Sequence, residues 1–216
     1  MDFEQARFNM IEQQIRPWDV LDLRVLALLA EIRREEFVAA AQRELAFADL
    51  ELPIGFGQSM WAPKLEARVL QELELRAADR VLEVGSGSGY LTALLARSCA
   101  HVTSVEVVPE LSAFASANLA RASVDNVRLR VGDAARGWSD GAPYDAIVLT
   151  GSTPVLAPEF FDFLAPGGKL FAVVGDAPVM VARLYQGVAS GISERDLFET
   201  QIGPLRNAPA PARFRF

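Results

Sequence analysis

A glycine-rich stretch in the middle of the chain has the spacing of a ligand-binding loop. Gly85-Ser86-Gly87-Ser88-Gly89 follows an apolar run and precedes a helical one. Such a loop lets a ligand approach the backbone closely and presents helix N-terminal amides to it. A dinucleotide fingerprint would need glycine where Tyr90 stands, and a P-loop would end in Lys followed by Ser or Thr. We therefore expect a strand–loop–helix ligand site that differs from both, although a tight turn is the simpler alternative.

Two carboxylates follow the next two expected strands. Glu106 ends the first of these strands, where an acid in a doubly wound fold accepts both hydroxyls of a ribose. Gly132-Asp133-Ala134 ends the second, and Asp133 can accept a hydrogen bond from an adenine amino group while its small neighbours leave space for the ring. Each acid alone could be a solvated strand end or a turn residue. Because the carboxyl ends of adjacent parallel strands form one ligand-binding edge, all three features together favour a nucleoside site.

Expected strands and helices alternate along the chain, and they must position the glycine loop and the two carboxylates. The pattern predicts an α/β, Rossmann-like, doubly wound, mostly parallel seven-stranded sheet with helices on both faces and an N-terminal helical extension. We treat the chain as one domain: extension and substrate loop at 1–62, cofactor-binding core at 63–205, tail at 206–216. Parallel strands are expected at 80–84, 101–106, 126–131, 144–150 and 169–174, an antiparallel edge pair at 179–188 and 197–203, and helices within 3–45 and at 64–75, 90–97, 109–121 and 158–164. Residues 45–63 are interpreted as loop, and the tail from 207 as extended or disordered.

Composition narrows the classes of partner. The 216 residues are 51% hydrophobic and carry 28 acids against 21 bases, a net charge of -7, which disfavours nucleic acid. No apolar run reaches membrane-spanning length, and we expect no signal peptide. Cys99 excludes an internal disulfide and reads as a small buried hydrophobe, and a single histidine, His101, makes a metal site or a histidine triad unexpected. We expect a cytoplasmic monomer with no metal, nucleic-acid or membrane partner.

Three motifs together resemble the Rossmann-like S-adenosylmethionine-dependent methyltransferases. Asp79–Tyr90 resembles the first motif of that class, Tyr144–Val148 its fourth-strand motif, and Leu164–Leu170 the turn that follows. An acidic pocket also suits a sulfonium cation. The resemblance implies S-adenosyl-L-methionine as cofactor and S-adenosyl-L-homocysteine as product. The residues that it implies for the cofactor are Glu83, Gly85, Ser86, Gly87, Ser88, Gly89, Glu106, Val107, Gly132, Asp133, Ala134 and Thr150.

A second resemblance covers about residues 5 to 205. LPIGFGQSMWAP, Leu52–Pro63, is similar to the LPIG-x-GQTIS-x-P segment of the protein-L-isoaspartate O-methyltransferases, and Asn9–Arg16, Arg34–Val38 and Ile202–Leu205 resemble other elements of that family. The family methylates the α-carboxylate of L-isoaspartyl residues in damaged proteins, and the ester closes to a succinimide that hydrolyses in part to aspartate. This chemistry suits a chain with one histidine, because a carboxylate is already ionised at pH 7 and alignment supplies much of the acceleration.

The resemblance implies an acceptor site with one informative departure. Its residues would be Ile54, Gly55, Gln58, Ser59, Met60, Trp61 and Gly203, with Ser59 and Trp61 at the reacting carboxylate. Trp61 stands where the family has a serine whose hydroxyl acts there, and indole offers one N–H donor and no acceptor. Ser59 is an alternative hydroxyl. Gly203 replaces a valine, and Leu149-Thr150-Gly151-Ser152 departs from VTA-A.

These departures leave three readings open. The first is an isoaspartyl-protein methyltransferase acting on damaged proteins or peptides. The second is a methyltransferase for another acceptor, such as a small carboxylic acid. The third is a non-catalytic protein that binds the cofactor or a partner.

Overall fold

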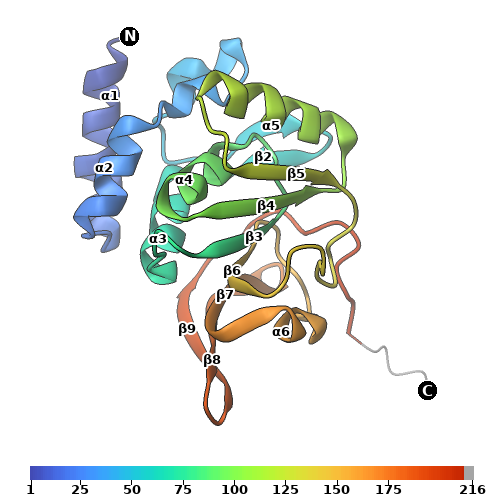
Figure 1. Ribbon diagram of the computed structural model, residues 1–216. Helices are drawn as coiled ribbons and strands as arrows, with labels where there is room; N and C mark the ends of the chain where they lie inside the picture. The colour runs from blue at the N-terminus through green and yellow to red at the C-terminus, as the bar shows by residue number, and fades with distance from the viewer. Residues whose placement is uncertain (212–216) are drawn as a thin grey trace.

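A seven-stranded sheet forms the centre of the protein in the computed structural model, which describes residues 1–211 (Figure 1). The strand order is β5-β4-β3-β6-β7-β8-β9. Strands β5, β4, β3, β6 and β7 are parallel to their neighbours, and β8 and β9 add an antiparallel edge. The bounds are β3 Arg80–Val84, β4 His101–Glu106, β5 Val127–Val131, β6 Tyr144–Leu149, β7 Leu164–Asp176, β8 Val179–Val188 and β9 Gly191–Glu199. The expected α/β, mostly parallel sheet is therefore confirmed.

The order of the strands creates a crevice beside β3. The chain runs from β3 outward to β4 and β5, and then returns to place β6 on the other side of β3. Open α/β sheets bind ligands at such a reversal, outside the carboxyl ends of the strands. The glycine loop after β3 and the acids after β4 and β5 all lie at this edge.

The two faces of the sheet are covered unequally. Helices α3 (Pro63–Leu73), α4 (Tyr90–Ser98) and α5 (Pro109–Arg121) contribute to the core on one face, together with the N-terminal extension. The other face is covered by the short α6 (Glu159–Asp162) and by connecting loops. Helix α6 is shorter than the predicted 158–164, because β7 already begins to pair with β6 at Leu164. Helices on both faces are confirmed.

The N-terminal extension is helical, as expected, but it consists of short pieces. Its elements are α1 (Phe3–Met10), the π-helix η1 (Ile11–Ile15), the 3-10 helix η2 (Arg16–Trp18), α2 (Leu23–Glu31), and the 3-10 helices η3 (Arg34–Glu36) and η4 (Ala40–Leu45). The carboxylates of Asp2 and Asp22 cap α1 and α2 by accepting backbone N–H bonds. The guanidinium of Arg7 donates to Glu35 at 2.6 Å, and both side chains are buried, so this ion pair joins α1 to η3.

The expectation of a loop over residues 45–63 was wrong in part. Leu52–Gly55 (β1) and Gln58–Met60 (β2) pair as a small antiparallel hairpin. Its turn contains three successive residues with positive φ, namely Gly55, Phe56 and Gly57. Strands of four and three residues are too short to show a period in the sequence, and the first contains a proline. The hairpin leaves the Phe56 side chain 52% exposed at its tip.

The C-terminal edge also differs from expectation. The pair at 179–188 is confirmed for β8, but its partner is Gly191–Glu199, whereas 197–203 was predicted. Strand β9 is exposed except at Leu197 and Phe198, and these two apolar residues are adjacent, so the strand offers no apolar alternation to detect. Of the predicted tail, residues 212–216 lie outside the described part of the chain.

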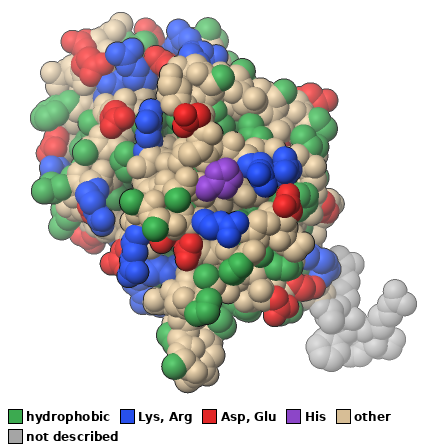
Figure 2. All heavy atoms as spheres, in the orientation of Figure 1, with side chains coloured by type: hydrophobic (Ala, Val, Ile, Leu, Met, Phe, Trp, Pro, Cys, Tyr) green, Lys and Arg blue, Asp and Glu red, His purple; other side chains and the backbone are tan. Residues whose placement is uncertain are grey.

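The surface in Figure 2 carries acidic and basic side chains intermixed over one face, with no continuous basic stripe in view. The single histidine, His101, begins β4, at the opposite end of that six-residue strand from Glu106. At about 3.3 Å per residue this places the imidazole roughly 16 Å from the crevice. No helix within residues 1–211 is long and apolar enough to cross a membrane.

Candidate functional site

The glycine loop closes tightly onto the end of β6. Gly85 has φ +99°, and a Cβ on it would lie 2.2 Å from the Thr150 hydroxyl oxygen. That hydroxyl donates to the carbonyls of Val84 and Gly85, both at 2.9 Å. The loop therefore requires glycine at this position for two reasons, the backbone conformation and the contact with Thr150.

The other two glycines of the loop have different surroundings. Gly87 has φ +51°, and its added Cβ would meet the Ile54 side chain at 3.1 Å, so the loop touches the β1–β2 hairpin. Gly89 has φ +82°, and its Cβ would meet the backbone of Ala115 in α5 at 3.2 Å. Gly89 thus permits α4 and α5 to pack closely, and it does not line the pocket described below.

Glu83, on β3, is a fully buried carboxylate directly below the loop. Its Oε2 accepts from the hydroxyls of Thr92 at 2.5 Å and Ser104 at 2.6 Å. The Ser104 hydroxyl also lies 2.5 Å from that of Ser86 in the loop. The other carboxyl oxygen of Glu83, Oε1, is buried and has no hydrogen-bond partner in the described structure. Burial raises the pKa of Glu83 to about 8, an effect that nearby Glu106 adds to and the two hydroxyls oppose.

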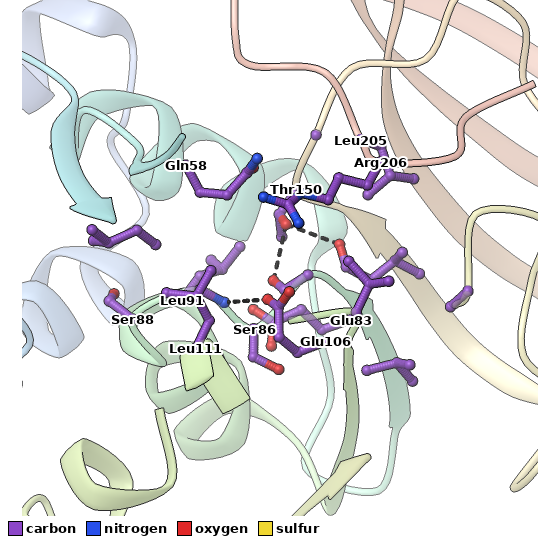
Figure 3. A pocket seen from close by; sticks show the side chains of 18 of the residues that line it. Gln58, Glu83, Ser86, Ser88, Leu91, Glu106, Leu111, Thr150, Leu205 and Arg206 are labelled. Carbon is purple, nitrogen blue, oxygen red and sulfur yellow. Dashed lines mark hydrogen bonds between the residues drawn. The ribbon is translucent and has the colours of Figure 1, made fainter. Parts of the chain in front are cut away.

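Glu106 holds the loop from the side of β4. Its Oε2 accepts from the backbone N–H of Gly87 and its Oε1 from that of Val108, both at 3.0 Å. Its side chain is buried and lines the pocket (Figure 3). The carboxylate at the end of β4 is therefore fixed in orientation by two backbone donors.

Asp133 follows β5 and receives an amide donor from the C-terminal segment. Its Oδ1 accepts from the Ala135 N–H at 3.0 Å, and its Oδ2 accepts from the side-chain NH2 of Asn207 at 2.9 Å. Asn207 has a positive φ of 61°. Asp133 is thus already positioned to accept from an NH2 group, the same kind of donor that adenine carries.

The hairpin supplies the opposite wall. Gln58, Ser59 and Met60 on β2 and Ile54 on β1 line the same pocket as the glycine loop. Ser59 is exposed, while Met60 is buried. Ser59 therefore contributes to the lining of the pocket and remains accessible to solvent.

Trp61 lies at the inner end of this wall. Its side chain is 5% exposed and packs edge-on against Phe171 of β7, with 6.2 Å between ring centroids. Its carbonyl accepts from the buried guanidinium of Arg34, which also pairs with Glu66 of α3. The indole belongs to the hydrophobic core and lines the pocket at its edge.

One pocket gathers most of the residues that the sequence singled out. Gly55, Gly89 and Gly203 do not line it, and Gly203 instead accepts a backbone bond from Ser152. The predicted residues that line it are Ile54, Gln58, Ser59, Met60, Trp61, Glu83, Gly85, Ser86, Gly87, Ser88, Glu106, Val107, Gly132, Asp133, Ala134 and Thr150.

Two charged residues that line the pocket, Glu66 and Arg206, were not predicted from the sequence. Glu66 had a detectable signal, because it lies on the apolar stripe of α3 with Val69, Leu70 and Leu73. Arg206 had no detectable signal, since no local sequence pattern shows that the C-terminal segment passes the pocket.

Comparison with known proteins places the chain in a family. Residues 5–200 match the model of the protein-L-isoaspartate(D-aspartate) O-methyltransferase family. The chain belongs to this family. A protein-L-isoaspartate O-methyltransferase 1 of Anaeromyxobacter sp. is 42% identical over 200 residues, covering 92% of this chain and 93% of the relative. A protein-L-isoaspartate O-methyltransferase of Methanoculleus marisnigri is 45% identical over 171 residues, covering 79% and 78%.

A solved structure has the same fold as this member of the isoaspartyl methyltransferase family. It is described as a protein-L-isoaspartate O-methyltransferase of Plasmodium falciparum in complex with S-adenosyl-L-homocysteine. The TM-score is 0.80 at 22% identity, with 95% of this chain and 99% of the other covered. The expected family and Rossmann-like fold class are thus confirmed.

Replacement of Gly85 tests the closure of the loop on Thr150. We expect Gly85→Ala to lower the free energy of unfolding by about 1–3 kcal/mol more than Gly57→Ala, because both glycines have positive φ but a Cβ at Gly57 meets nothing within 4 Å. Urea denaturation of both variants measures the difference. Equal losses would show that the contact with Thr150 costs nothing.

The raised pKa of Glu83 makes stability depend on pH. The unfolded carboxyl loses its proton near pH 4.5 and the folded one near pH 8, so the unfolded state binds fewer protons between these values. This contribution to stability is therefore complete below pH 4.5 and is lost as the pH rises to 8, at up to about 1.4 kcal/mol per pH unit. We expect Glu83→Gln to flatten the dependence in denaturant unfolding from pH 5 to 8.

Burial also raises the pKa of Glu66 to about 8, and the charge of Glu83 adds to this rise. The difference between the two curves therefore reports Glu83 together with its effect on Glu66. Parallel curves for the wild type and Glu83→Gln would mean that Glu83 is ionised in the folded protein.

Proposed function

We propose that this protein is an S-adenosylmethionine-dependent methyltransferase that esterifies the α-carboxylate of L-isoaspartyl residues in damaged proteins and peptides. One observation carries the proposal: a single pocket joins the glycine loop and its carboxylates to the β2 wall that bears Ser59. Family membership adds the expected acceptor. We further propose that the protein works as a monomer in the cytoplasm.

The residues of the pocket fit the cofactor. Glu83 presents a buried oxygen without a partner, which is costly unless a donor or a cation reaches it. A Cβ on Gly85 would collide with the Thr150 hydroxyl and one on Gly87 would press on the Ile54 side chain, so glycine at both positions keeps the loop backbone bare at the pocket. Glu66, Glu83 and Glu106 line the same space. Burial raises the pKa of Glu66 and of Glu83 to about 8, and a cation beside them favours their ionised forms, which suits the sulfonium and ammonium groups of S-adenosylmethionine.

Each cofactor-binding residue has a separate role in this proposal. Glu106 accepts the ribose hydroxyls, and Asp133 accepts from the adenine amino group, exchanging the NH2 of Asn207 for that of the ring. Gly132 and Ala134 leave space beside Asp133 for the adenine, while Val107 and Thr150 line the same cavity. When bound, S-adenosylmethionine supplies an activated methyl group.

Ser59 is the group that we assign to the reacting carboxylate. It is exposed and lines the pocket, and its hydroxyl group makes no hydrogen bond to any described residue. The Trp61 indole is packed against Phe171, so it shapes the pocket and leaves the polar contact to Ser59. A carboxylate acceptor needs no proton removed, which is consistent with His101 lying at the far end of β4. The chain therefore needs only to align the acceptor and exclude water.

A different acceptor is the second candidate, and Trp61 is the observation that favours it. An indole at the serine position makes the edge of the pocket more aromatic and less polar. A small carboxylic acid would tolerate this change better than a peptide whose backbone must pass the same wall.

Replacement of Glu106 tests the cofactor site. We expect Glu106→Gln to weaken S-adenosylhomocysteine binding about 10- to 100-fold, because it removes a charge-assisted acceptor from the ribose hydroxyls. Isothermal titration calorimetry measures the affinity. Glu110→Gln, a neutralised acid on the exposed first turn of α5, is the control. Unchanged affinity in Glu106→Gln would remove the ribose assignment.

Methyl transfer to matched peptides tests the acceptor. We expect the wild type to methylate an isoaspartyl peptide and not its aspartyl isomer, and Ser59→Ala to lower kcat/KM about tenfold or more. Transfer of radiolabelled methyl groups measures both rates. A wild type that methylates only small carboxylic acids would establish the second candidate, and cofactor binding without any transfer would establish a non-catalytic protein.

Trp61→Ser belongs in the same series but needs a stability control. Removing a buried indole costs about 3–5 kcal/mol, so the variant is compared with Trp61→Phe at a temperature where both are folded. An isoaspartyl activity that appears only in Trp61→Ser would contradict the assignment of repair to the natural chain.

A further inference from the structure

The segment after β9 crosses the rim of the pocket on a fixed path. The Ser152 N–H donates to the Gly203 carbonyl at 2.9 Å, and the Leu205 N–H donates back to the Ser152 carbonyl at 2.8 Å. A Cβ on Gly151 would lie 2.6 Å from the Leu205 nitrogen, so glycine admits the close approach. Asn207 then bonds to Asp133 on the far side. The residue between these anchors, Arg206, is held at the pocket.

Arg206 extends from this segment across the mouth of the pocket toward the hairpin. Figure 3 shows its side chain reaching from beside Leu205 in the direction of Gln58, above Glu83 and Glu106. Its Nη2 donates to the Phe56 carbonyl at 2.5 Å, at the hairpin tip. Among the described residues it has no carboxylate within ion-pair distance, and a guanidinium has five N–H donors. Most of its donors are therefore available to a ligand.

The charge of the pocket makes Arg206 distinctive. Four carboxylates line the pocket, those of Glu66, Glu83, Glu106 and Asp133, and Arg206 is the one cation in its described lining. An anionic acceptor that enters this space is repelled by those carboxyl groups that are ionised, unless a cation meets it. Guanidinium matches the geometry of a carboxylate with two parallel N–H bonds.

Two carboxylates reach this pocket in the proposed reaction, that of the acceptor and that of the cofactor's methionine portion. The Phe56 contact places the guanidinium on the hairpin side, next to the wall that bears Ser59. We propose that Arg206 binds the carboxylate of the methyl acceptor and so determines the preference of this site for anionic acceptors. This inference rests on the proposed function and adds a residue from the C-terminal segment to the acceptor site.

The test compares Arg206→Gln, Arg206→Lys and the wild type on the full chain. We expect Arg206→Gln to raise KM for an isoaspartyl peptide about 10- to 100-fold. Arg206→Lys should have an intermediate KM, because lysine keeps the positive charge but cannot donate two parallel N–H bonds to a carboxylate. The affinity for S-adenosylhomocysteine, measured by calorimetry, should change less than about twofold. Arg130→Gln is the control, because Arg130 pairs with Asp140 on the surface at 3.3 Å and does not line the pocket.

The outcomes separate this inference from the proposed function. An unchanged peptide KM in Arg206→Gln, or a loss of S-adenosylhomocysteine affinity as large as the loss for peptide, overturns the role of Arg206 while leaving methyl transfer intact. Should the wild type transfer no methyl group, calorimetric titration of the isoaspartyl peptide into the S-adenosylhomocysteine complex decides the inference independently. Binding that is lost in Arg206→Gln supports the inference although the proposed reaction fails, and no binding to the wild type overturns both.

Discussion

The buried guanidinium of Arg34 joins the N-terminal extension to the rest of the molecule. It donates to the Ala46 carbonyl at 2.8 Å, to the Trp61 carbonyl and to the Glu66 carboxylate, and it lies 4.9 Å from the Tyr90 ring centroid in α4. A charge so deeply buried persists only when its donors are satisfied. One side chain therefore fixes the positions of α3, α4 and the residue that ends the β2 wall, and the pocket depends on all of these.

The pocket concentrates carboxyl groups where water is scarce. Glu83 and Glu106 are both buried and both serve the glycine loop, the first through the hydroxyls of Ser104 and Ser86 and the second through the Gly87 N–H. Burying these carboxylates opposes folding, and a bound cation offsets that cost. A negative potential in the pocket would favour a sulfonium cation and disfavour an anionic acceptor. Arg206, the one cation in the described lining, can offset this repulsion at the rim.

Local patterns predicted those elements whose own residues bury a face. Strands such as Arg80–Val84 and His101–Glu106 agree with the sequence because they are short and valine-rich, and nearly all of their residues are buried, as in parallel strands covered on both faces. The β1–β2 hairpin and the bounds of β9 were not predicted, since three-residue strands and largely exposed strands have no periodicity. These elements exist because their backbone groups pair with neighbours, which is a nonlocal property.

The sequence by itself determined which residues meet around the glycine loop. Glycines, Glu106 and Asp133 each act within a few residues of a strand end, so spacing alone places them at one edge of the sheet. Only the tertiary structure decided the hairpin side of the pocket. The position of the Trp61 indole depends on its packing against Phe171, and whether Arg206 reaches the pocket depends on the backbone bonds of Ser152. These residues are far apart in the sequence and come into contact only when the chain packs, so no local sequence pattern predicts their contacts.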